Sequence, residues 1–412
     1  MDDYDFKGKV VLARLDLNCP IDPTTGEFLD ERRLYAAKDT LCYLCDRGAK
    51  VAVLAHQGRP GDEYDYTTLQ KHAERLSKIT EKPVEYVDDI FGSTARDRIK
   101  NMKEGCVVVL ENVRFYAEEP LQRPPDSQTK THLVRSLSKC ADYFVNDAFA
   151  AAHRSQPSLV GFTTLVPSFP GKTVEEELKV LSKVQKSTKK MSIFVLGGSK
   201  AKDSLKVIDK ALTNGAADKI LTGGLVSIIF LAAKGYDIGD PSQEFLRGKN
   251  LDKLVPYAKE LLEKYGDKIE LPMDLALDRH GKRMEIGLSE LPMPYRIVDI
   301  GSGTIGRYSY LISTADKILA NGPMGYFEVE AFARGTNEML EALGRTEAFT
   351  VIGGGHLAVA AEKMKLRKRI NHISTAGGAC IMYLAGEPLP VLDALERSAE
   401  KFTKGKKGGK KK

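Results

Sequence analysis

Short runs of apolar and β-branched residues alternate along the chain with longer stretches of mixed polarity. Such runs are typical of strands buried on both faces of a parallel sheet, and the stretches between them are typical of amphipathic helices. Four strands are predicted in the first half of the chain, at Lys9–Leu15, Lys50–Ala55, Cys106–Leu110 and Tyr143–Asn146. Five are predicted in the second half, at Met191–Leu196, Lys219–Thr222, Arg296–Ile300, Lys317–Ala320 and Phe349–Ile352.

The two sets of strands predict an α/β protein with two doubly wound, parallel-sheet (Rossmann-like) domains joined by a long helix. A break between the sets lies at Val166–Gly171, where two prolines and a glycine interrupt regular structure. An apolar stripe at helical spacing follows it, at Val174, Leu178, Leu181 and Val184. A single (β/α)₈ barrel is the competing architecture, but it offers no reason for a break at the centre of the chain.

The composition is that of an ordinary globular protein. The 412 residues are 42% hydrophobic and 29% charged, which is enough for more than one domain core. The sequence contains no run of 18 apolar residues, so no membrane span is predicted. The acidic start Met1–Asp5 is unlike a signal peptide. Six cysteines are too few for a disulfide scaffold. We therefore expect a cytoplasmic protein with no membrane partner.

The net charge of +6 is concentrated at the end of the chain. Residues 404–412 contain only lysine and glycine, and their six lysines leave the rest of the chain with no net charge. Because such a segment cannot bury apolar area, we expect it to be disordered. A nucleic-acid partner is not expected from a charge placed in this way, although a non-catalytic polyanion binder that uses this tail stays open as a further class.

Arginine stands at the end of every predicted strand of the first half or shortly after it. In open α/β sheets, ligands bind beyond the carboxyl ends of the strands. The residues found there are Arg14, Asp16 and Asn18, then His56 and Arg59, then Arg114, and finally His153 and Arg154. Because the guanidinium fork matches phosphate and carboxylate oxygens, these positions predict a small polyanionic ligand.

Glycine follows the predicted strands of the second half instead, at residues 197–198, 223–224, 301, 303, 322 and 353–355. Glycine lets backbone N–H groups approach phosphates closely, and a following helix N-terminus adds a favourable dipole. Lys200 could add a point charge for a terminal phosphate. An arginine-lined domain beside a glycine-lined one suits phosphoryl transfer, where catalysis is mainly positioning and charge stabilisation.

One glycine motif supports an alternative function. Residues 301–306 read Gly-Ser-Gly-Thr-Ile-Gly after a predicted strand, which is the spacing of dinucleotide-binding loops. An NAD-dependent dehydrogenase is therefore the alternative. The motif lies deep in the second half, however, and the acidic residue that should follow it could only be Glu328, beyond another Gly-Pro turn.

Eight segments, in order along nearly the whole chain, resemble the phosphoglycerate kinase family. They are Arg14–Pro20, His56–Pro60, Glu111–Arg114, Asn146–Arg154, Leu196–Lys200, Asn321–Gly325, Gly353–Gly355 and Ser374–Gly378. The Asp-Leu-Asn and Gly-Gly-Gly-His forms are similar to the archaeal branch of that family.

The resemblance implies a phosphotransferase with a carboxyl group as acceptor. In glycolysis and gluconeogenesis it would transfer a phosphoryl group reversibly between 1,3-bisphosphoglycerate and ADP, giving 3-phosphoglycerate and ATP with Mg²⁺. The residues implied for the triose are Asp16, Asn18, Arg33, His56, Arg59, Arg114 and Arg154. Those implied for the nucleotide are Lys200, Glu328, Gly353, Gly354, Gly355 and His356, with Glu328 at the ribose. Arg33, Lys200, Gly355 and Gly378 would act on the moving phosphoryl group.

This chemistry agrees with the residues at the strand ends. The acceptor is already a carboxylate or a diphosphate anion, so the reaction needs no general base. It needs positive charge around the equatorial oxygens of the transferring group, which Arg33, Lys200 and backbone amides can supply.

We expect residues 1–170 to form the triose-phosphate (anion) binding domain and 171–190 the interdomain helix and hinge. Residues 191–385 would form the nucleotide-binding domain, 386–403 a segment returning to the first domain, and 404–412 the tail.

Three positions depart from the family pattern. His356 replaces an aspartate and is a poor ligand for Mg²⁺, Ser204 replaces a lysine and Ala376 a glycine. The metal ligands therefore stay unknown, and a monomer and a homodimer both stay open.

Overall fold

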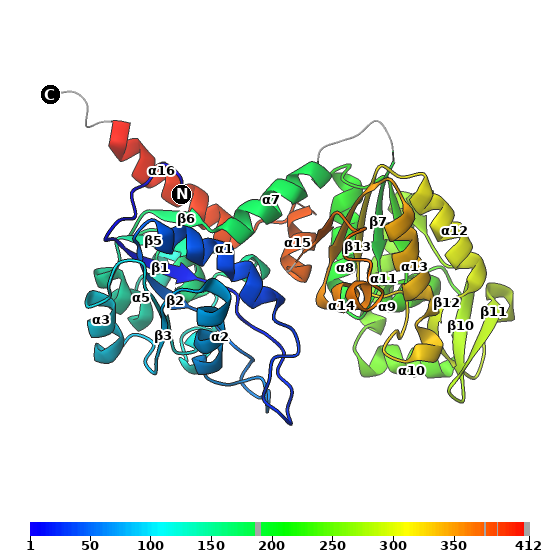
Figure 1. Cartoon of the computed structure of the whole chain (residues 1–412). Helices are drawn as coiled ribbons and strands as arrows, with labels where there is room; N and C mark the ends of the chain where they lie inside the picture. The colour runs from blue at the N-terminus through cyan, green and yellow to red at the C-terminus, as the bar shows by residue number, and fades with distance from the viewer. Residues whose placement is uncertain (186–190, 375, 385, 408–412) are drawn as a thin grey trace. The chain divides into compact units, whose positions relative to one another are not determined.

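The structure is a computed structural model, and it describes residues 1–185, 191–374, 376–384 and 386–407 (Figure 1). Two compact units make up the chain. Unit 1 comprises Met1–Lys179 and Pro388–Lys412, and unit 2 comprises Val180–Glu387. Each unit contains its own parallel sheet of six strands, so the prediction of two doubly wound α/β domains is confirmed and the single barrel is wrong.

The sheet of unit 1 has the strand order β3-β4-β2-β1-β5-β6, and all its pairs are parallel. Its strands are β1 (Val10–Arg14), β2 (Lys50–Leu54), β3 (Val84–Val87), β4 (Val107–Leu110), β5 (Tyr143–Asn146) and β6 (Ser168–Pro170). Strand residues alternate between two cores. Val11 and Ala13 of β1 pack in the core that contains α1 (Arg32–Asp46) and α2 (Gln70–Thr80). Leu12 packs in the core that contains α3 (Ser93–Lys100) and α5 (His132–Leu137).

Burial on both faces explains why the strands of unit 1 are almost wholly apolar. Two short helices, α4 (Pro125–Gln128) and α6 (Pro157–Val160), complete the layer around α5. The three-residue strand β6 lies inside the Pro-rich segment that we predicted as a break. Proline is tolerated there because β6 is an edge strand, which needs fewer backbone donors.

The parallel sheet of unit 2 has the order β15-β14-β13-β7-β8-β9. Its strands are β7 (Ser192–Leu196), β8 (Lys219–Thr222), β9 (Ile269–Glu270), β13 (Lys317–Asn321), β14 (Phe349–Gly353) and β15 (His372–Ile373). The chain runs outward from β7 through β8 to β9 and then continues on the other side of β7 with β13. The switch between β7 and β13 is the place where doubly wound sheets bind ligands.

Besides the end of the helix that enters from unit 1, the described residues of unit 2 form eight α-helices. They are α8 (Ala201–Thr213), α9 (Gly224–Ala233), α10 (Asp240–Gly248), α11 (Val255–Tyr265), α12 (Ser302–Ser313), α13 (Arg334–Arg345), α14 (Gly355–Lys363) and α15 (Gly377–Leu384). The core on one face of the sheet joins residues of β7, β13 and β14 to α12, α13 and α14. Ser204 of α8 is buried, so it faces the interior, whereas Lys202 and Lys206 of the same helix are exposed.

One predicted strand lies outside the parallel sheet. β12 (Arg296–Ile300) pairs antiparallel with β10 (Asp274–Arg279), which also pairs with β11 (Lys282–Gly287) in a separate sheet of three strands. The expectation that β12 contributes to the parallel sheet is therefore wrong. Its apolar run is buried because α9, α10 and α13 pack against it, and a buried run alone does not reveal which strands are its neighbours.

The predicted connecting helix is α7 (Lys172–Gln185), which begins in unit 1 and ends in unit 2. Its first turn is fixed by Asp147, just after β5, whose Oδ1 accepts a hydrogen bond from the backbone N–H of Val174 at 3.0 Å. Burial raises the pKa of Asp147 to about 6. Residues 186–190, the rest of the predicted helix and hinge, lie outside the described residues.

The last helix, α16 (Pro390–Lys407), lies beside β6 of unit 1 (Figure 1) and packs against β6 and α6. The Ser398 hydroxyl accepts a hydrogen bond from the backbone N–H of Ser168 at 3.2 Å, and the Lys401 ammonium donates to the Thr164 carbonyl at 2.8 Å. α16 continues four residues into the stretch predicted to be disordered, since lysine is a good helix former once a helix is anchored. Residues 408–412 lie outside the described residues.

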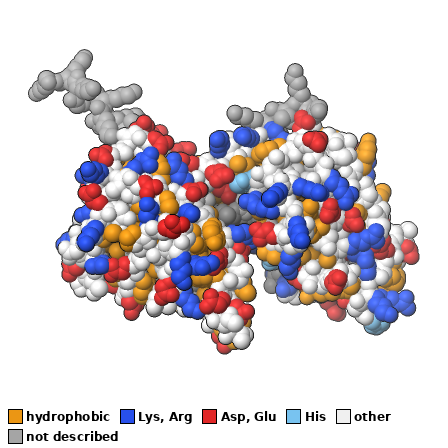
Figure 2. Space-filling view, in the orientation of Figure 1, with side chains coloured by type: hydrophobic (Ala, Val, Ile, Leu, Met, Phe, Trp, Pro, Cys, Tyr) orange, Lys and Arg blue, Asp and Glu red, His pale blue; other side chains and the backbone are white. Residues whose placement is uncertain are grey.

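Acidic and basic side chains are interspersed over the visible face of both units, as is usual for a globular protein (Figure 2). Within the part of the chain that the structure describes, no helix combines the length and apolar character that crossing a membrane requires.

Candidate active site

The predicted triose residues lie beyond the carboxyl ends of the strands of unit 1. Asp16 and Asn18 follow β1, His56 and Arg59 follow β2, and Arg33 lies in the first turn of α1. Arg114 lies in the short 3₁₀ helix after β4, and Arg154 lies in the loop that follows β5. The fold thus brings to one edge residues that are up to 138 positions apart in the sequence.

Hydrogen bonds connect Arg33 to Asp16 and Asn18 in the loop after β1, and connect that loop to the loop after β2. The Arg33 guanidinium donates from Nη1 to Asp16 Oδ1 at 3.1 Å and to the carbonyl of Asn18 at 2.9 Å. The Asn18 side-chain oxygen accepts a hydrogen bond from the backbone N–H of Gly58 at 2.8 Å. Because Gly58 lies in the loop after β2, these contacts join the first two strand ends into a single surface.

The remaining arginines lie close enough to influence one another. The pKa of Arg114 is lowered to about 10, first by burial and then by the positive charges of Arg154, Arg14 and Arg59 in that order. Burial also lowers the pKa of Arg154, and Arg59 is the next largest cause. Arg59 itself is exposed, and its guanidinium has no hydrogen-bond or ion-pair partner among the described residues. Positive charge therefore accumulates here beyond what the protein's own carboxylates balance.

Three residues lie behind this edge: Arg14, which was predicted as a strand-end arginine, and Ser158 and Glu119, to which the sequence assigned no role. Arg14 ends β1 and is 1% exposed, and its Nη2 lies 2.9 Å from Nδ1 of His56. Its Nε donates a hydrogen bond to the hydroxyl of Ser158 at 2.9 Å, and that hydroxyl donates to Glu119 at 2.6 Å. Glu119 and Ser158 follow no predicted strand and belong to no motif, so no pattern in the sequence could have indicated them.

In unit 2, the loop after β14 and the start of α15 lie together. A Cβ added at Gly377 would be 2.8 Å from the Cα of Gly354, and one added at Gly354 would be 2.9 Å from Asn321 Oδ1. Gly354 has a φ of 91°, a conformation that glycine adopts readily, and it is the N-cap of α14. The ends of β13 and β14 and the N-terminus of α15 therefore converge.

Gly355 and Gly378, in the first turns of α14 and α15, are exposed, and a Cβ added at either would meet nothing within 4 Å. The first amides of a helix have no acceptor inside it, and the helix dipole favours an anion there. Two helix N-termini consequently present donors next to each other. Lys200 is the N-cap of α8 after β7, and its side chain is exposed.

The other predicted glycines of this edge have a different role. The Gly198 N–H donates to the Pro323 carbonyl at 2.8 Å, and the Gly224 N–H donates to the Met324 carbonyl at 2.6 Å. A Cβ at Gly197 would lie 2.3 Å from the Pro323 oxygen. These glycines let the backbones at the ends of β7, β8 and β13 pack closely against one another. Fewer of the glycine loops after the strands therefore have backbone N–H groups available for phosphates than the sequence predicted.

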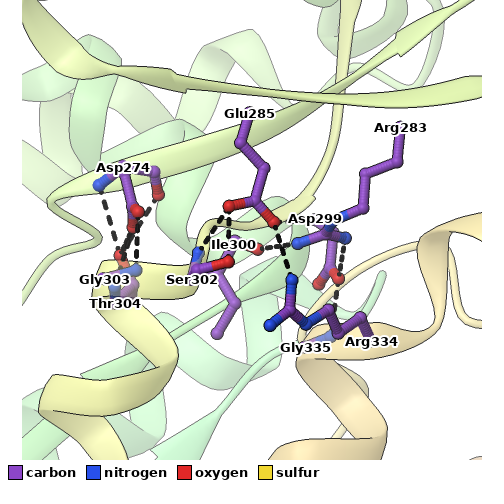
Figure 3. Close-up of polar contacts among 10 residues, drawn as sticks. All are labelled: Asp274, Arg283, Glu285, Asp299, Ile300, Ser302, Gly303, Thr304, Arg334 and Gly335. Atoms are coloured by element: carbon purple, nitrogen blue, oxygen red, sulfur yellow. Dashed lines mark hydrogen bonds and ion pairs between the residues drawn. The ribbon is translucent and has the colours of Figure 1, made fainter.

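The motif at residues 301–306 has its first amides already occupied (Figure 3). The Gly303 and Thr304 N–H groups each donate to a carboxylate oxygen of Asp274 at 2.7 Å, and the Ser302 N–H donates to Glu285 at 3.0 Å. A Cβ at Gly301 would lie 2.3 Å from the carboxyl carbon of Asp274. Carboxylates stand where a pyrophosphate would bind, so the dinucleotide interpretation is wrong.

A family model for phosphoglycerate kinase matches residues 1–387. The chain belongs to the phosphoglycerate kinase family. It is 49% identical to the phosphoglycerate kinase of Methanothermus fervidus over 98% of both chains, and 46% identical to that of Pyrococcus abyssi over 97% of this chain and 98% of the relative. The resemblance to archaeal members is confirmed.

Solved structures of phosphoglycerate kinases also match. The crystal structure of the Pyrococcus horikoshii enzyme aligns with a TM-score of 0.90 at 45% identity, covering 97% of this chain and 99% of that one. The Coxiella burnetii enzyme aligns with a TM-score of 0.79 at 28% identity over the same shares. The predicted activity is thereby confirmed as phosphoryl transfer to a carboxylate acceptor, and the dehydrogenase alternative is excluded.

Family membership implies a nucleotide reaction that generally uses Mg²⁺, a cation that takes oxygen ligands. Among the described residues, no three His, Cys, Asp or Glu side chains are grouped so that they could hold a metal ion. His356 is exposed near the ring of Phe327, with centroids 5.8 Å apart, and an imidazole is a poor ligand for Mg²⁺. These residues do not fit a protein-held magnesium site.

Proposed function

We propose that the arginine-lined edge of unit 1 binds 3-phosphoglycerate or 1,3-bisphosphoglycerate and that unit 2 binds ADP or ATP. Asp16, Asn18, His56 and the arginines at positions 33, 59, 114 and 154 would hold the triose. The residues proposed for the nucleotide are Lys200, Glu328, Gly353, Gly354, Gly355 and His356. Mg²⁺ would enter as the complex with the nucleotide phosphates, which is its usual mode of binding in phosphotransferases. The glycolytic reaction suggests a cytoplasmic location.

The single observation that supports the triose site best is the accumulation of unbalanced positive charge. Burial is the largest cause that lowers the pKa values of Arg14, Arg114 and Arg154, and the charges of neighbouring arginines act on each in the same direction, so like charges repel one another at this edge. A ligand with a phosphate and a carboxylate, or with two phosphates, would relieve that repulsion. Guanidinium groups also match such oxygens in geometry.

For the transfer itself, we propose that Arg33, Lys200 and the first amides of α14 and α15, at Gly355 and Gly378, stabilise the transferring phosphoryl group. The acceptor oxygen is already anionic, so no residue of the chain has to remove a proton. What the protein supplies is oriented positive charge around oxygens that become more negative in the transition state.

Replacing Arg114 by alanine tests the triose site. We expect the KM for 3-phosphoglycerate to rise about 10- to 100-fold, which is the effect of losing a charged hydrogen bond, with the KM for ATP unchanged. The matched control is Arg98→Ala, which removes an arginine of unit 1 that is exposed and paired with Glu85. An unchanged KM for 3-phosphoglycerate in Arg114→Ala, or an equal change in Arg98→Ala, would overturn the assignment.

A further inference from the structure

The protonation of His56 can be read from its neighbour. Nδ1 of His56 lies 2.9 Å from Nη2 of Arg14. A guanidinium carries five N–H donors and no acceptor, and it keeps its proton in proteins. Nδ1 must therefore accept this hydrogen bond and cannot itself carry a proton. The ring is neutral, and its proton is on Nε2.

Arg14 is itself held firmly by buried groups. Its Nη1 donates to the carbonyl of Leu15, and its Nε donates to the Ser158 hydroxyl at 2.9 Å. That hydroxyl donates to Oε1 of Glu119 at 2.6 Å, and the Ser158 N–H donates to Oε2 at 3.1 Å. Both carboxylate oxygens of Glu119 thus accept hydrogen bonds. One serine separates the buried carboxylate from the buried guanidinium.

All four residues of this chain of contacts are buried, so the loss of any one contact would leave a buried polar group without its partner. Arg14 and Glu119 are each 1% exposed, Ser158 is fully buried and His56 is 5% exposed. A buried charge is costly unless it is paired and hydrogen-bonded, so Glu119 is what allows Arg14 to remain inside as a cation. Burial raises the pKa of Glu119, and the charge of Arg14 is the largest cause acting against that rise.

The imidazole of His56 lies among the charges of the candidate triose site. Burial holds the pKa of His56 well below its usual value, and the charges of Arg14, Arg114, Arg154 and Arg33 act in the same direction. The ring therefore lies among the arginines proposed for the triose. Within the described part of the chain, no residue hydrogen-bonds to Nε2, so the N–H at that position is free to donate to a ligand.

We infer that Arg14, Ser158 and Glu119 are positioning residues that fix His56 as its Nε2–H tautomer, so that the imidazole donates a hydrogen bond to an anionic oxygen of the triose. The opposite tautomer would present a lone pair to a carboxylate or phosphate oxygen, which only accepts hydrogen bonds. The identity of the ligand rests on the proposed function, whereas the tautomer of the free protein does not.

Nitrogen NMR of the ligand-free protein tests the tautomer directly. In protein labelled with ¹⁵N-histidine at pH 7, with His56→Asn used to assign the signal, we expect an unprotonated Nδ1 and a protonated Nε2. A proton on Nδ1, or on both nitrogens, would overturn the inference. If the expected tautomer is found but 3-phosphoglycerate leaves the His56 signals unchanged, the proposed triose site and the donor role fail while the tautomer stands.

Two variants test the supporting residues. Ser158→Ala removes the hydroxyl between Arg14 and Glu119 with little change in volume, and Glu119→Gln removes the charge. In each we expect a mixture of His56 tautomers and a KM for 3-phosphoglycerate raised about 3- to 10-fold, with the KM for ATP unchanged. Ser158→Ala is the milder change and keeps the test available if Glu119→Gln does not fold.

The matched controls are Ser168→Ala and Glu111→Gln, which alter buried residues of unit 1 outside this chain of contacts. Ser168 donates to the Val166 carbonyl, and Glu111 accepts from the N–H of Leu69. Both controls should keep the single tautomer and the KM of the parent protein. Parent-like spectra and KM values in Ser158→Ala and Glu119→Gln, or tautomer mixtures in the controls as well, would overturn the positioning role.

Discussion

The arginines of unit 1 differ in how the protein holds them, and this difference separates their proposed roles. Arg33 donates to Asp16 and to the Asn18 carbonyl, so its guanidinium is oriented by the loop after β1. Arg114 is held by the carbonyl of Gly58 and lies next to Arg154 and Arg59 in its electrostatic environment. The fixed orientation of Arg33 suits a directed contact with the ligand, whereas Arg114 belongs to a cluster of positive charges that attracts an anion.

We therefore expect Arg33→Ala to act mainly on kcat. Loss of one oriented donor at a transition state typically costs about 10²- to 10³-fold in rate, and Arg33 is proposed to touch the transferring group. The KM for 3-phosphoglycerate should change less than it does in Arg114→Ala. Steady-state kinetics with both substrates varied measures both quantities. Small and equal effects of the two substitutions on kcat would contradict this division of roles.

At the scale of helices and strands, buried apolar runs correctly predicted most of the central strands of the parallel sheets. All four strands predicted in the first half are present as β1, β2, β4 and β5, because each is buried on both faces. The short strands β3, β6, β9 and β15 were missed. All four are edge strands. β6, β9 and β15 have only two or three residues, too few for a pattern to be recognised, and only one residue of β3 is buried.

The candidate site was predictable to the extent that strand ends mark it. Asp16, His56, Arg114 and Arg154 follow strands, and parallel topology alone brings such residues to one edge. Glu119 and Ser158 act through contacts made only in the folded chain. The glycine motif at residues 301–306 misled for a similar reason, since the carboxylates of Asp274 and Glu285 that occupy its amides come from β10 and β11.

The helix α16 gives a prediction at this scale. Its Val391, Ala394 and Leu395 are buried, and burying one Val or Leu side chain is worth about 1.5–3 kcal/mol. Truncation after Leu389 should therefore lower the stability of unit 1 by several kcal/mol, measured by urea unfolding. Truncation after Lys407 should change neither stability nor kcat/KM.

Two results would contradict this account of the chain end. Unchanged stability without α16 would show that its packing against β6 and α6 contributes nothing. A several-fold loss of kcat/KM on removing only residues 408–412 would show that the terminal lysines take part in the reaction, which a solvated tail does not. ADP binding by the chain truncated after Leu389 serves as the control and should be unchanged, because the proposed nucleotide residues all belong to unit 2.

At the scale of the whole molecule, the division into two units makes ligand binding separable. Every residue proposed for the triose belongs to unit 1, and every residue proposed for the nucleotide belongs to unit 2, each with its own sheet and core. A ligand that binds only the folded form of one unit stabilises that unit by mass action. Local opening reactions of that unit should then slow, and amide hydrogen exchange reports them segment by segment.

We expect 3-phosphoglycerate alone to protect peptides that follow β1, β2, β4 and β5, at residues 15–20, 55–60, 111–116 and 147–155. The magnesium complex of ADP alone should protect residues 197–202, 322–329 and 353–358. Hydrogen exchange followed by mass spectrometry can compare both ligands in one experiment, with the β10–β11 hairpin at residues 276–286 as an internal reference that neither ligand should touch. Protection of unit 1 by the nucleotide alone, to the degree seen in unit 2, would contradict the assignment of one ligand to each unit. The same would hold if 3-phosphoglycerate protected the N-termini of α14 and α15 while leaving the arginine-lined edge unchanged, because the open amides there would then be the triose site.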